Sequence, residues 1–184
     1  MFQPRQGTKA AISVWSQTED LDAIIGPSCS KSCLTVALIA DAWLIPVISY
    51  GCYSDALSDP KQYPNFARSV GTTQLVALIA NHITEYFGWE TIGIISSKSS
   101  VHLSMARNHK KLHSQSGKQV FFFSATSTLT SSDQNKELER MRQILRLMKM
   151  KCRIIFAYMY PLNVRDMLAL AQEEDMLEGK ICSL

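Results

Sequence analysis

The stretch DAIIGPSCSKSCLTVALIADAWLIPVISYGCY, residues 22–53, contains one complete strand–helix–strand step. Its first apolar run, residues 22–25, stops at Gly26 and Pro27, as a buried strand does at a sharp turn. A second short apolar run, residues 45–49, is rich in β-branched residues. Because a strand that follows a helix this closely pairs parallel to the strand before it, both strand ends are expected at one edge of a sheet.

The helix between these strands is expected to begin just after Ser28, whose hydroxyl can accept a hydrogen bond from an orphan backbone N–H. Apolar residues recur at helical spacing as far as Trp43, at Cys33, Val36, Ala37 and Ala40. This periodicity predicts a helix that packs one face against the sheet. Ligands bind at the carboxyl edge of such sheets, because loops and helix N-termini present free backbone donors there.

Composition excludes several classes of protein. The 184 residues are 46% hydrophobic and 19% charged, which is ordinary for one large or two small globular domains. The net charge of +3 is small and spread along the chain, so no nucleic-acid footprint is expected. Apolar runs such as 75–80 and 154–160 are far shorter than the ~20 residues of a membrane helix, and residues 1–9 show no secretory signal.

The remaining sequence continues the alternation of strands and helices. A helix over 2–17 precedes the first strand, and a short strand over 66–70 follows a polar loop. Thr72 or Thr73 then caps a helix that ends at Gly88 and carries an apolar stripe of Val76, Ile79, Ile83 and Phe87.

Three further strands are predicted at 91–96, 120–124 and 153–158, each followed by a helical pattern, with a polar loop at 126–133. The third of these helices opens at Pro161. The whole pattern predicts an α/β fold of three-layer, doubly wound parallel sheets.

The motif IIGPSCS, followed in order by W-x-IPVIS-x-GC, YPNFARSVGTT and FGW, resembles the extracellular ligand-binding region of membrane receptor guanylyl cyclases, natriuretic peptide receptor type. The resemblance runs from about Ala11 to about Gly179. It implies a type I periplasmic-binding-protein fold that is incomplete, with the first strand and the second half missing. It also implies a partial first lobe at residues 1–70 and a partial second lobe at 71–184.

The same resemblance implies an extracellular ligand-sensing role. In the intact parent, a peptide or small-molecule ligand would act on a homodimer and change the conversion of GTP to cyclic GMP, with the membrane reached only through parts missing here. The alternative is an amino-acid or other small-molecule binding domain of a class C receptor or a periplasmic binder. The chain itself carries no phosphate-binding loop or catalytic triad motif, so neither catalysis nor a cofactor is expected of it. A doubly wound enzyme and an inactive partial product remain as further alternatives.

Candidate ligand-binding residues follow three predicted strands at the ligand edge. They are Ser28, Ser30, Gly51, Tyr53, Ser97 and Ser99. Each lies where a turn offers hydroxyls or free N–H groups to a polar ligand. The alternative is that the serines only cap the helices that they precede.

Cys29 and Cys52 are expected to form a disulfide, because both lie at carboxyl ends of neighbouring parallel strands. The alternative is two small buried thiols. His109 and His113 stand one helical turn apart, but without a third ligand on that helix they are expected to be solvated and to hold no metal.

Overall fold

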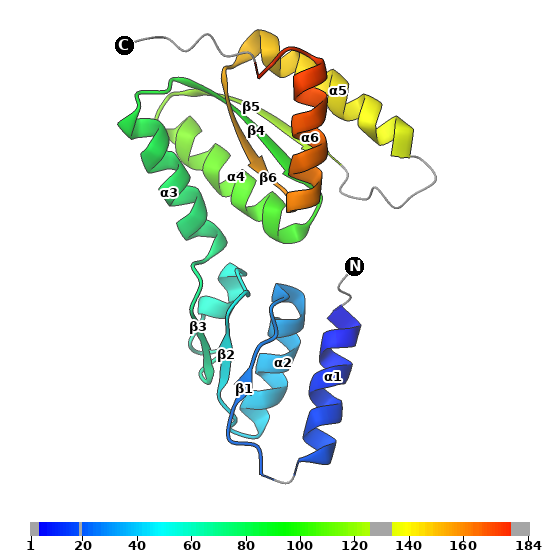
Figure 1. Ribbon diagram of the computed structural model, residues 1–184. Coiled ribbons are helices and arrows are strands. Elements are labelled where there is room, and N and C mark those ends of the chain that lie inside the picture. The colour runs from blue at the N-terminus through cyan, green and yellow to red at the C-terminus, as the bar shows by residue number, and fades with distance from the viewer. Residues whose placement is uncertain (1–3, 19, 126–133, 178–184) are drawn as a thin grey trace. The chain divides into compact units, whose positions relative to one another are not determined.

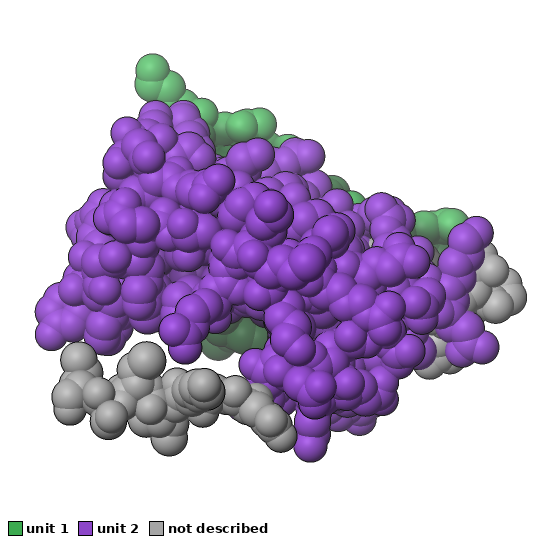
Figure 2. All heavy atoms as spheres, turned by 90° about the horizontal axis from the view of Figure 1, so that it is seen from above, with its two compact units in different colours: residues 1–76 green, residues 77–184 purple. Residues whose placement is uncertain are grey.

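The computed structural model describes residues 4–18, 20–125 and 134–177. The chain divides into two compact units, residues 1–76 and 77–184, which are coloured separately in Figure 2. The division falls within a helix, α3 (Thr73–Tyr86), a little after the predicted boundary at residue 70. Each unit has a parallel sheet of its own (Figure 1).

The first unit contains a three-stranded parallel sheet in the order β1-β2-β3. Its elements are α1 (Pro4–Gln17), β1 (Ile24–Ile25), α2 (Ser30–Ala42), β2 (Val47–Ser49), the 3₁₀ helix η1 (Asp55–Ser58) and β3 (Phe66–Arg68). Ile24 pairs with Val47, and Val47 pairs with Phe66. The predicted parallel strand–helix–strand step is therefore confirmed.

Helix α2 buries the face that its periodicity predicts, with Cys33, Val36, Ala37 and Ala40 all removed from solvent. Its start differs from the prediction. Cys29 is the N-cap and makes no side-chain capping bond, so Ser28 lies one residue too early to cap the helix. At its other end Trp43 is 61% exposed and packs edge-on against Trp15 of α1, with ring centroids 4.3 Å apart.

The second unit has the strand order β5-β4-β6, again all parallel. Besides most of α3, it contains β4 (Thr91–Ser97), α4 (Ser100–Gln115), β5 (Gln119–Ala125), α5 (Gln134–Lys151), β6 (Ile154–Tyr158) and α6 (Pro161–Glu173). Gly88 and Gly117 adopt positive φ of 64° and 75° after α3 and α4, where side chains other than glycine are disfavoured.

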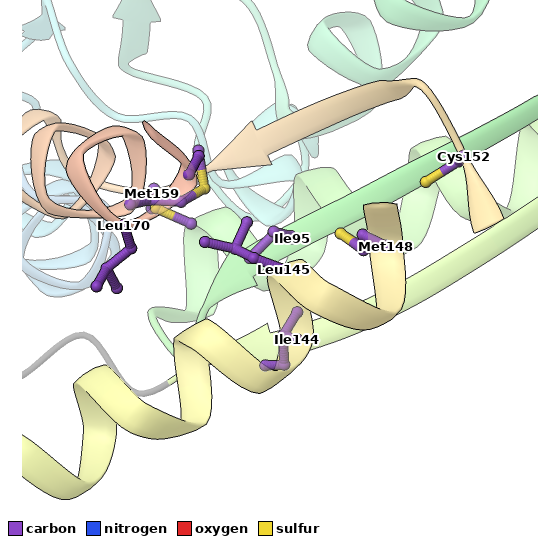
Figure 3. Close-up of a cluster of buried hydrophobic side chains, with 9 residues drawn as sticks. Ile95, Ile144, Leu145, Met148, Cys152, Met159 and Leu170 are labelled. Carbon is purple, nitrogen blue, oxygen red and sulfur yellow. The ribbon is translucent and has the colours of Figure 1, made fainter. Parts of the chain in front are cut away.

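The central strand β4 has helices on both of its faces. Ile95 packs into a cluster with Leu145 of α5 and Leu170 of α6, drawn in Figure 3. Ile92 and Ile94 instead join a cluster that includes α4. Because successive residues of a strand point to opposite faces, this alternation gives the predicted three-layer α/β arrangement.

Helix α3 buries a different face from the predicted stripe. Ala77, Ala80 and Thr84 are buried, whereas Ile79 and Phe87 are 52% and 59% exposed. Thr84 Oγ1 lies 3.3 Å from His113 Nδ1 of α4. The short side chains allow this close helix approach, and they repeat with the same helical period as the larger apolar residues.

Two sequence-based expectations lie outside the described residues. They concern the polar loop over 126–133 and the segment after residue 177. Within the described ranges, no helix combines the length and hydropathy needed to cross a bilayer.

Candidate functional site

The turns after β1 and β2 meet at the carboxyl edge of the first unit's sheet. The N–H of Tyr53 donates a 3.0 Å hydrogen bond to Ser30 Oγ. A Cβ added at Gly51 would lie only 3.0 Å from the Cβ and the carbonyl oxygen of Ser28. Four of the candidate residues, Ser28, Ser30, Gly51 and Tyr53, are thus brought together.

Several polar groups of these turns already have protein partners. Ser30 is buried, and its hydroxyl holds the second turn. Ser49 Oγ donates to Pro27 O at 2.7 Å and accepts from the Gly51 N–H at 3.3 Å. Ser28 is exposed beside this network. The two turns are therefore pre-organised, with Ser30 and Gly51 in structural positions and Ser28 facing solvent.

A disulfide lies directly beneath these turns, but with a different pairing from the predicted one. Cys33 bonds to Cys52, with Cα atoms 6.4 Å apart, and Cys29 is free and half-buried. The predicted Cys29–Cys52 bond is therefore wrong, as is the alternative of two buried thiols. Cys33 belongs to the buried face of α2, which turns its side chain toward the core that holds Cys52.

Arg68, at the end of β3, holds the turn after β2 from the side. Its guanidinium donates to Cys52 O at 2.9 Å and to Ser54 O at 2.8 Å, and it also contacts Ser58 Oγ. Burial lowers the pKa of Arg68, and the nearby Asp55 carboxylate opposes this shift. Sequence reasoning missed this residue, because a single arginine after a strand has no distinguishing spacing.

Asp55 connects the same turn to the start of α3. Its carboxylate accepts from the Thr73 hydroxyl and, at 3.1 Å, from the Gln74 N–H. The Thr73 N–H donates to Tyr53 O at 3.0 Å, and Thr72 Oγ1 caps the helix as predicted. A carboxylate at a helix N-terminus also interacts favourably with the helix dipole. A movement of the turn after β2 would therefore act directly on the first turn of α3.

The candidate residues of the second unit form a closed turn after β4. Ser97 is buried, with its Oγ 2.7 Å from His102 Nδ1 and 3.4 Å from the donating Ser99 N–H. Burial lowers the pKa of His102, which favours the neutral ring. The cavity beside Ser97 has a volume of about 30 Å³, which suits a water molecule and is far below the ~300 Å³ of a small-molecule pocket.

A larger hollow lies at the opposite, amino end of the first unit's strands. It has a volume of about 430 Å³, and Trp15 of α1 lines it together with Leu21, Trp43 and Ile45. Its walls are mostly apolar, whereas the candidate turns after β1 and β2 are polar. None of the predicted ligand-binding residues lines it.

The two histidines of α4 are buried, so the prediction that they are solvated is wrong. His109 Nδ1 lies 2.9 Å from Tyr158 Oη, and His113 Nδ1 lies near Thr84. Burial, assisted by His113, lowers the pKa of His109 to about 4. Among the described residues, no cluster of three or more His, Cys, Asp or Glu side chains could hold a metal ion. The histidines are neutral core groups.

Residues 3–181 match the family described as the receptor family ligand binding region. The chain belongs to this family. This match covers nearly the whole chain, including both parallel sheets. The chain is thus a ligand-binding region of receptor type, which is a binding module and not a catalytic domain.

Receptor-type guanylate cyclases and taste receptors are among the relatives that the chain matches. The chain is 35% identical over 80 residues to a receptor-type guanylate cyclase of Caenorhabditis elegans, gcy-8, covering 43% of the chain and 7% of that protein. It is 32% identical over 75 residues to taste receptor type 1 member 1 of Homo sapiens, covering 41% of the chain and 9% of that receptor. A second guanylate cyclase, gcy-23, is 29% identical over 96 residues. The matched segments span less than a tenth of each of these relatives.

Proposed function

We propose that this chain is the extracellular ligand-sensing region of a receptor guanylate cyclase, which couples ligand binding to cyclic GMP production in the intact parent. The observation that carries the proposal is the match of residues 3–181 to a receptor ligand-binding region. The guanylate cyclase assignment is supported by the relatives gcy-8 and gcy-23. The motifs GPSC and GC, which resemble that class, lie together at the carboxyl edge of the first sheet, and the motif IPVIS contains the strand β2.

Ligand binding would act through the turns after β1 and β2. A ligand that contacts the exposed Ser28 hydroxyl, or the side chain of Tyr53, lies next to the Ser30–Tyr53 hydrogen bond. The same turn bonds to the start of α3 through Asp55. A shift of the turn is thereby passed to α3, because Tyr53 and Asp55 are both hydrogen-bonded to its first residues. The ligand in this proposal is a peptide or a small molecule, and the intact receptor is a homodimer.

The alternative function is an amino-acid or other small-molecule binding domain of a class C receptor. The similarity to the taste receptor, 32% over 75 residues, favours this alternative. The two functions share the binding fold and differ in the domains to which that fold is joined in the intact receptor. Only the first of them requires a cyclase domain in the same polypeptide.

The full-length transcript from the same locus distinguishes these functions. A reading frame that includes a membrane span followed by a cyclase domain supports the proposal. The decisive assay then measures cyclic GMP formation by the intact protein in transfected cells, with a variant of the cyclase domain as the inactive control. A transcript that encodes a seven-helix membrane bundle instead would contradict the guanylate cyclase assignment.

A further inference from the structure

Helix α3 carries large apolar side chains on its exposed face. That face consists mainly of Leu78, Ile79, His82, Ile83, Tyr86 and Phe87, named here the α3 stripe. All six are exposed, Tyr86 by as much as 84%. The buried residues of the helix are instead small or polar, among them Ala77, Ala80 and Thr84. Because a helix of a monomeric protein ordinarily buries its large apolar side chains, this arrangement indicates an interaction surface.

The α3 stripe has the shape that helix–helix packing requires. Its two rows of residues spaced four apart, 79–83–87 and 78–82–86, form parallel ridges with a groove between them. A ridge of a second helix can lie in this groove, as in the commonest class of helix packing.

The stripe is also tapered along the helix, which makes it complementary to a copy of itself. Its carboxyl end carries the aromatic residues Tyr86 and Phe87, and its amino end carries the smaller Leu78 and Ile79. In an antiparallel pair of the same helix, the large end of each copy meets the small end of the other. A two-fold axis then passes near Ile83, so the same patch is used by both copies.

The charge of α3 does not oppose pairing with a copy of itself. The helix contains no lysine or arginine, and Glu85 is its one carboxylate. Glu85 accepts a 2.8 Å hydrogen bond from Asn81 Nδ2 and lies 3.4 Å from His82 Nδ1. A stripe of this kind selects neither a basic nor an acidic partner, whereas a second copy meets little like-charge repulsion.

The aromatic end of the stripe is held in place by the core of the second unit. Phe87 stacks on Trp89, with ring centroids 5.0 Å apart and the ring planes 15° from parallel. Tyr86 packs edge-on against Phe87, and Trp89 packs edge-on against Phe156 of β6. Aromatic side chains that are already ordered lose little conformational freedom on binding, so Tyr86 and Phe87 are suited to anchor an interface.

We propose that the α3 stripe is a contact between two copies of this chain, which pair as an antiparallel, two-fold symmetric α3–α3 dimer. The stripe exposes roughly 600 Å² per copy, since an aromatic side chain alone can bury about 150–250 Å². Two copies would together remove roughly 1,200 Å² from solvent, which exceeds the about 1,000 Å² needed for a specific interface. The proposal rests on the composition and exposure of α3 and is independent of which receptor type contains the chain.

Sedimentation velocity of the full chain tests the dimer at concentrations between about 1 and about 200 μM, with free thiols first blocked by N-ethylmaleimide. The expected dissociation constant is on the order of 10 μM, because the buried area is at the low end for specific interfaces. Ile83→Lys places a charge near the two-fold axis and should weaken dimerisation by about tenfold or more. Leu147→Lys of α5 is the matched control, since Leu147 is 46% exposed and Ile83 is 41% exposed, and it should leave the dissociation constant unchanged.

A charge-pairing experiment tests the antiparallel arrangement. Ile83→Lys and Ile83→Glu chains should each remain monomeric alone, whereas their mixture should form a heterodimer, because the opposite charges meet near the axis. Circular dichroism shows whether each variant is folded, and Tyr86→Lys, at the most exposed position of the stripe, provides the same test of dimerisation if an Ile83 variant is not.

Three results would overturn the proposal. The first is an unaltered chain that stays monomeric over the whole concentration range, which would assign the stripe to a different protein or to another part of the intact receptor. The second is association that folded Ile83→Lys or Tyr86→Lys does not weaken, which would place the contact elsewhere. The third is a mixture of folded Ile83→Lys and Ile83→Glu chains that forms no heterodimer. None of these results affects the receptor assignment, which the transcript tests separately.

Discussion

Ser30 Oγ accepts a 3.0 Å hydrogen bond from the backbone N–H of Tyr53, and this single bond joins the turns after two neighbouring parallel strands. Ser30 is buried, so no water readily replaces its hydroxyl. The bond aligns Ser28 and Cys29 with Gly51 and Cys52, and through Tyr53 it continues to the first turn of α3.

Replacement of Ser30 by alanine is expected to destabilise the first unit. The Tyr53 N–H would lose its acceptor in a buried setting, which costs about 1–3 kcal/mol in the free energy of unfolding. Urea unfolding of Ser30→Ala and of the unaltered chain measures this loss. Ser28→Ala is the matched control, because Ser28 is exposed and its change should stay within about 0.5 kcal/mol. Equal effects of the two variants would contradict the assigned role of Ser30.

Replacement of Arg68 by either alanine or lysine is expected to loosen the turn after β2. Lysine keeps the positive charge but lacks the planar fork that reaches Cys52 O and Ser54 O together. Hydrogen exchange of the backbone N–H groups of residues 52–58 should accelerate in both variants, and more in Arg68→Ala. Arg153→Ala, at an exposed position of the second unit, serves as control and should leave that exchange unchanged. Full protection in Arg68→Lys would show that charge alone is sufficient.

Acid is expected to destabilise the second unit through His109. Its pKa is about 4 in the folded chain against an ordinary value of 6.5, so the unfolded chain binds the proton first as the pH falls. The contribution of neutral His109 to the free energy of unfolding is present above pH 6.5. About 3 kcal/mol of this free energy is lost as the pH falls from 6.5 to 4. Urea unfolding across this range measures the loss.

Two variants separate this titration from simple loss of packing. His109→Gln keeps a polar side chain that does not titrate, so its stability should vary less between pH 6.5 and 4. Tyr158→Phe removes the hydroxyl 2.9 Å from His109 Nδ1 and should lower stability at every pH while retaining the pH dependence. A pH dependence that is unchanged in His109→Gln would rule out His109 as its source.

Gly93 of β4 is expected to tolerate a larger side chain only when Cys152 is shortened. A Cβ on Gly93 would lie 2.7 Å from Cys152 Sγ and 3.1 Å from Met148 Cε, so Gly93→Ala should cost about 1–3 kcal/mol through overpacking. In the double variant with Cys152→Ala the sulfur is absent, and the two changes should destabilise less than their sum. A double-mutant cycle of unfolding free energies measures this coupling. Additive effects would show that the strand adjusts elsewhere.

Much of the fold can be predicted from local patterns in the sequence. The runs over 22–25 and 45–49, with a helix between them, predict parallel strands, and Ile24 pairs with Val47 as expected. Gly88 and Gly117 mark helix ends because their positive φ favours a residue without a Cβ. These features depend on a few neighbouring residues, so the sequence contains all the information needed to predict them.

The choice between equivalent local patterns depends on tertiary packing. Cys29 and Cys33 both stand near the start of α2, and only the direction of the buried helix face makes Cys33 the partner of Cys52. On α3, the large apolar residues and the small ones have the same period, and the close approach of α4 selects the small ones.

The βαβ order, the parallel sheets and the receptor-type motifs at their carboxyl edge follow from periodicity and from turn residues within a few positions of each other, so they can be predicted from the sequence. The disulfide pairing, the burial of His109 and the hydrogen bonds of Arg68 to the turn after β2 depend instead on how distant segments pack. Each of these depends on where side chains from segments distant in the sequence meet. Local spacing does not encode such distances.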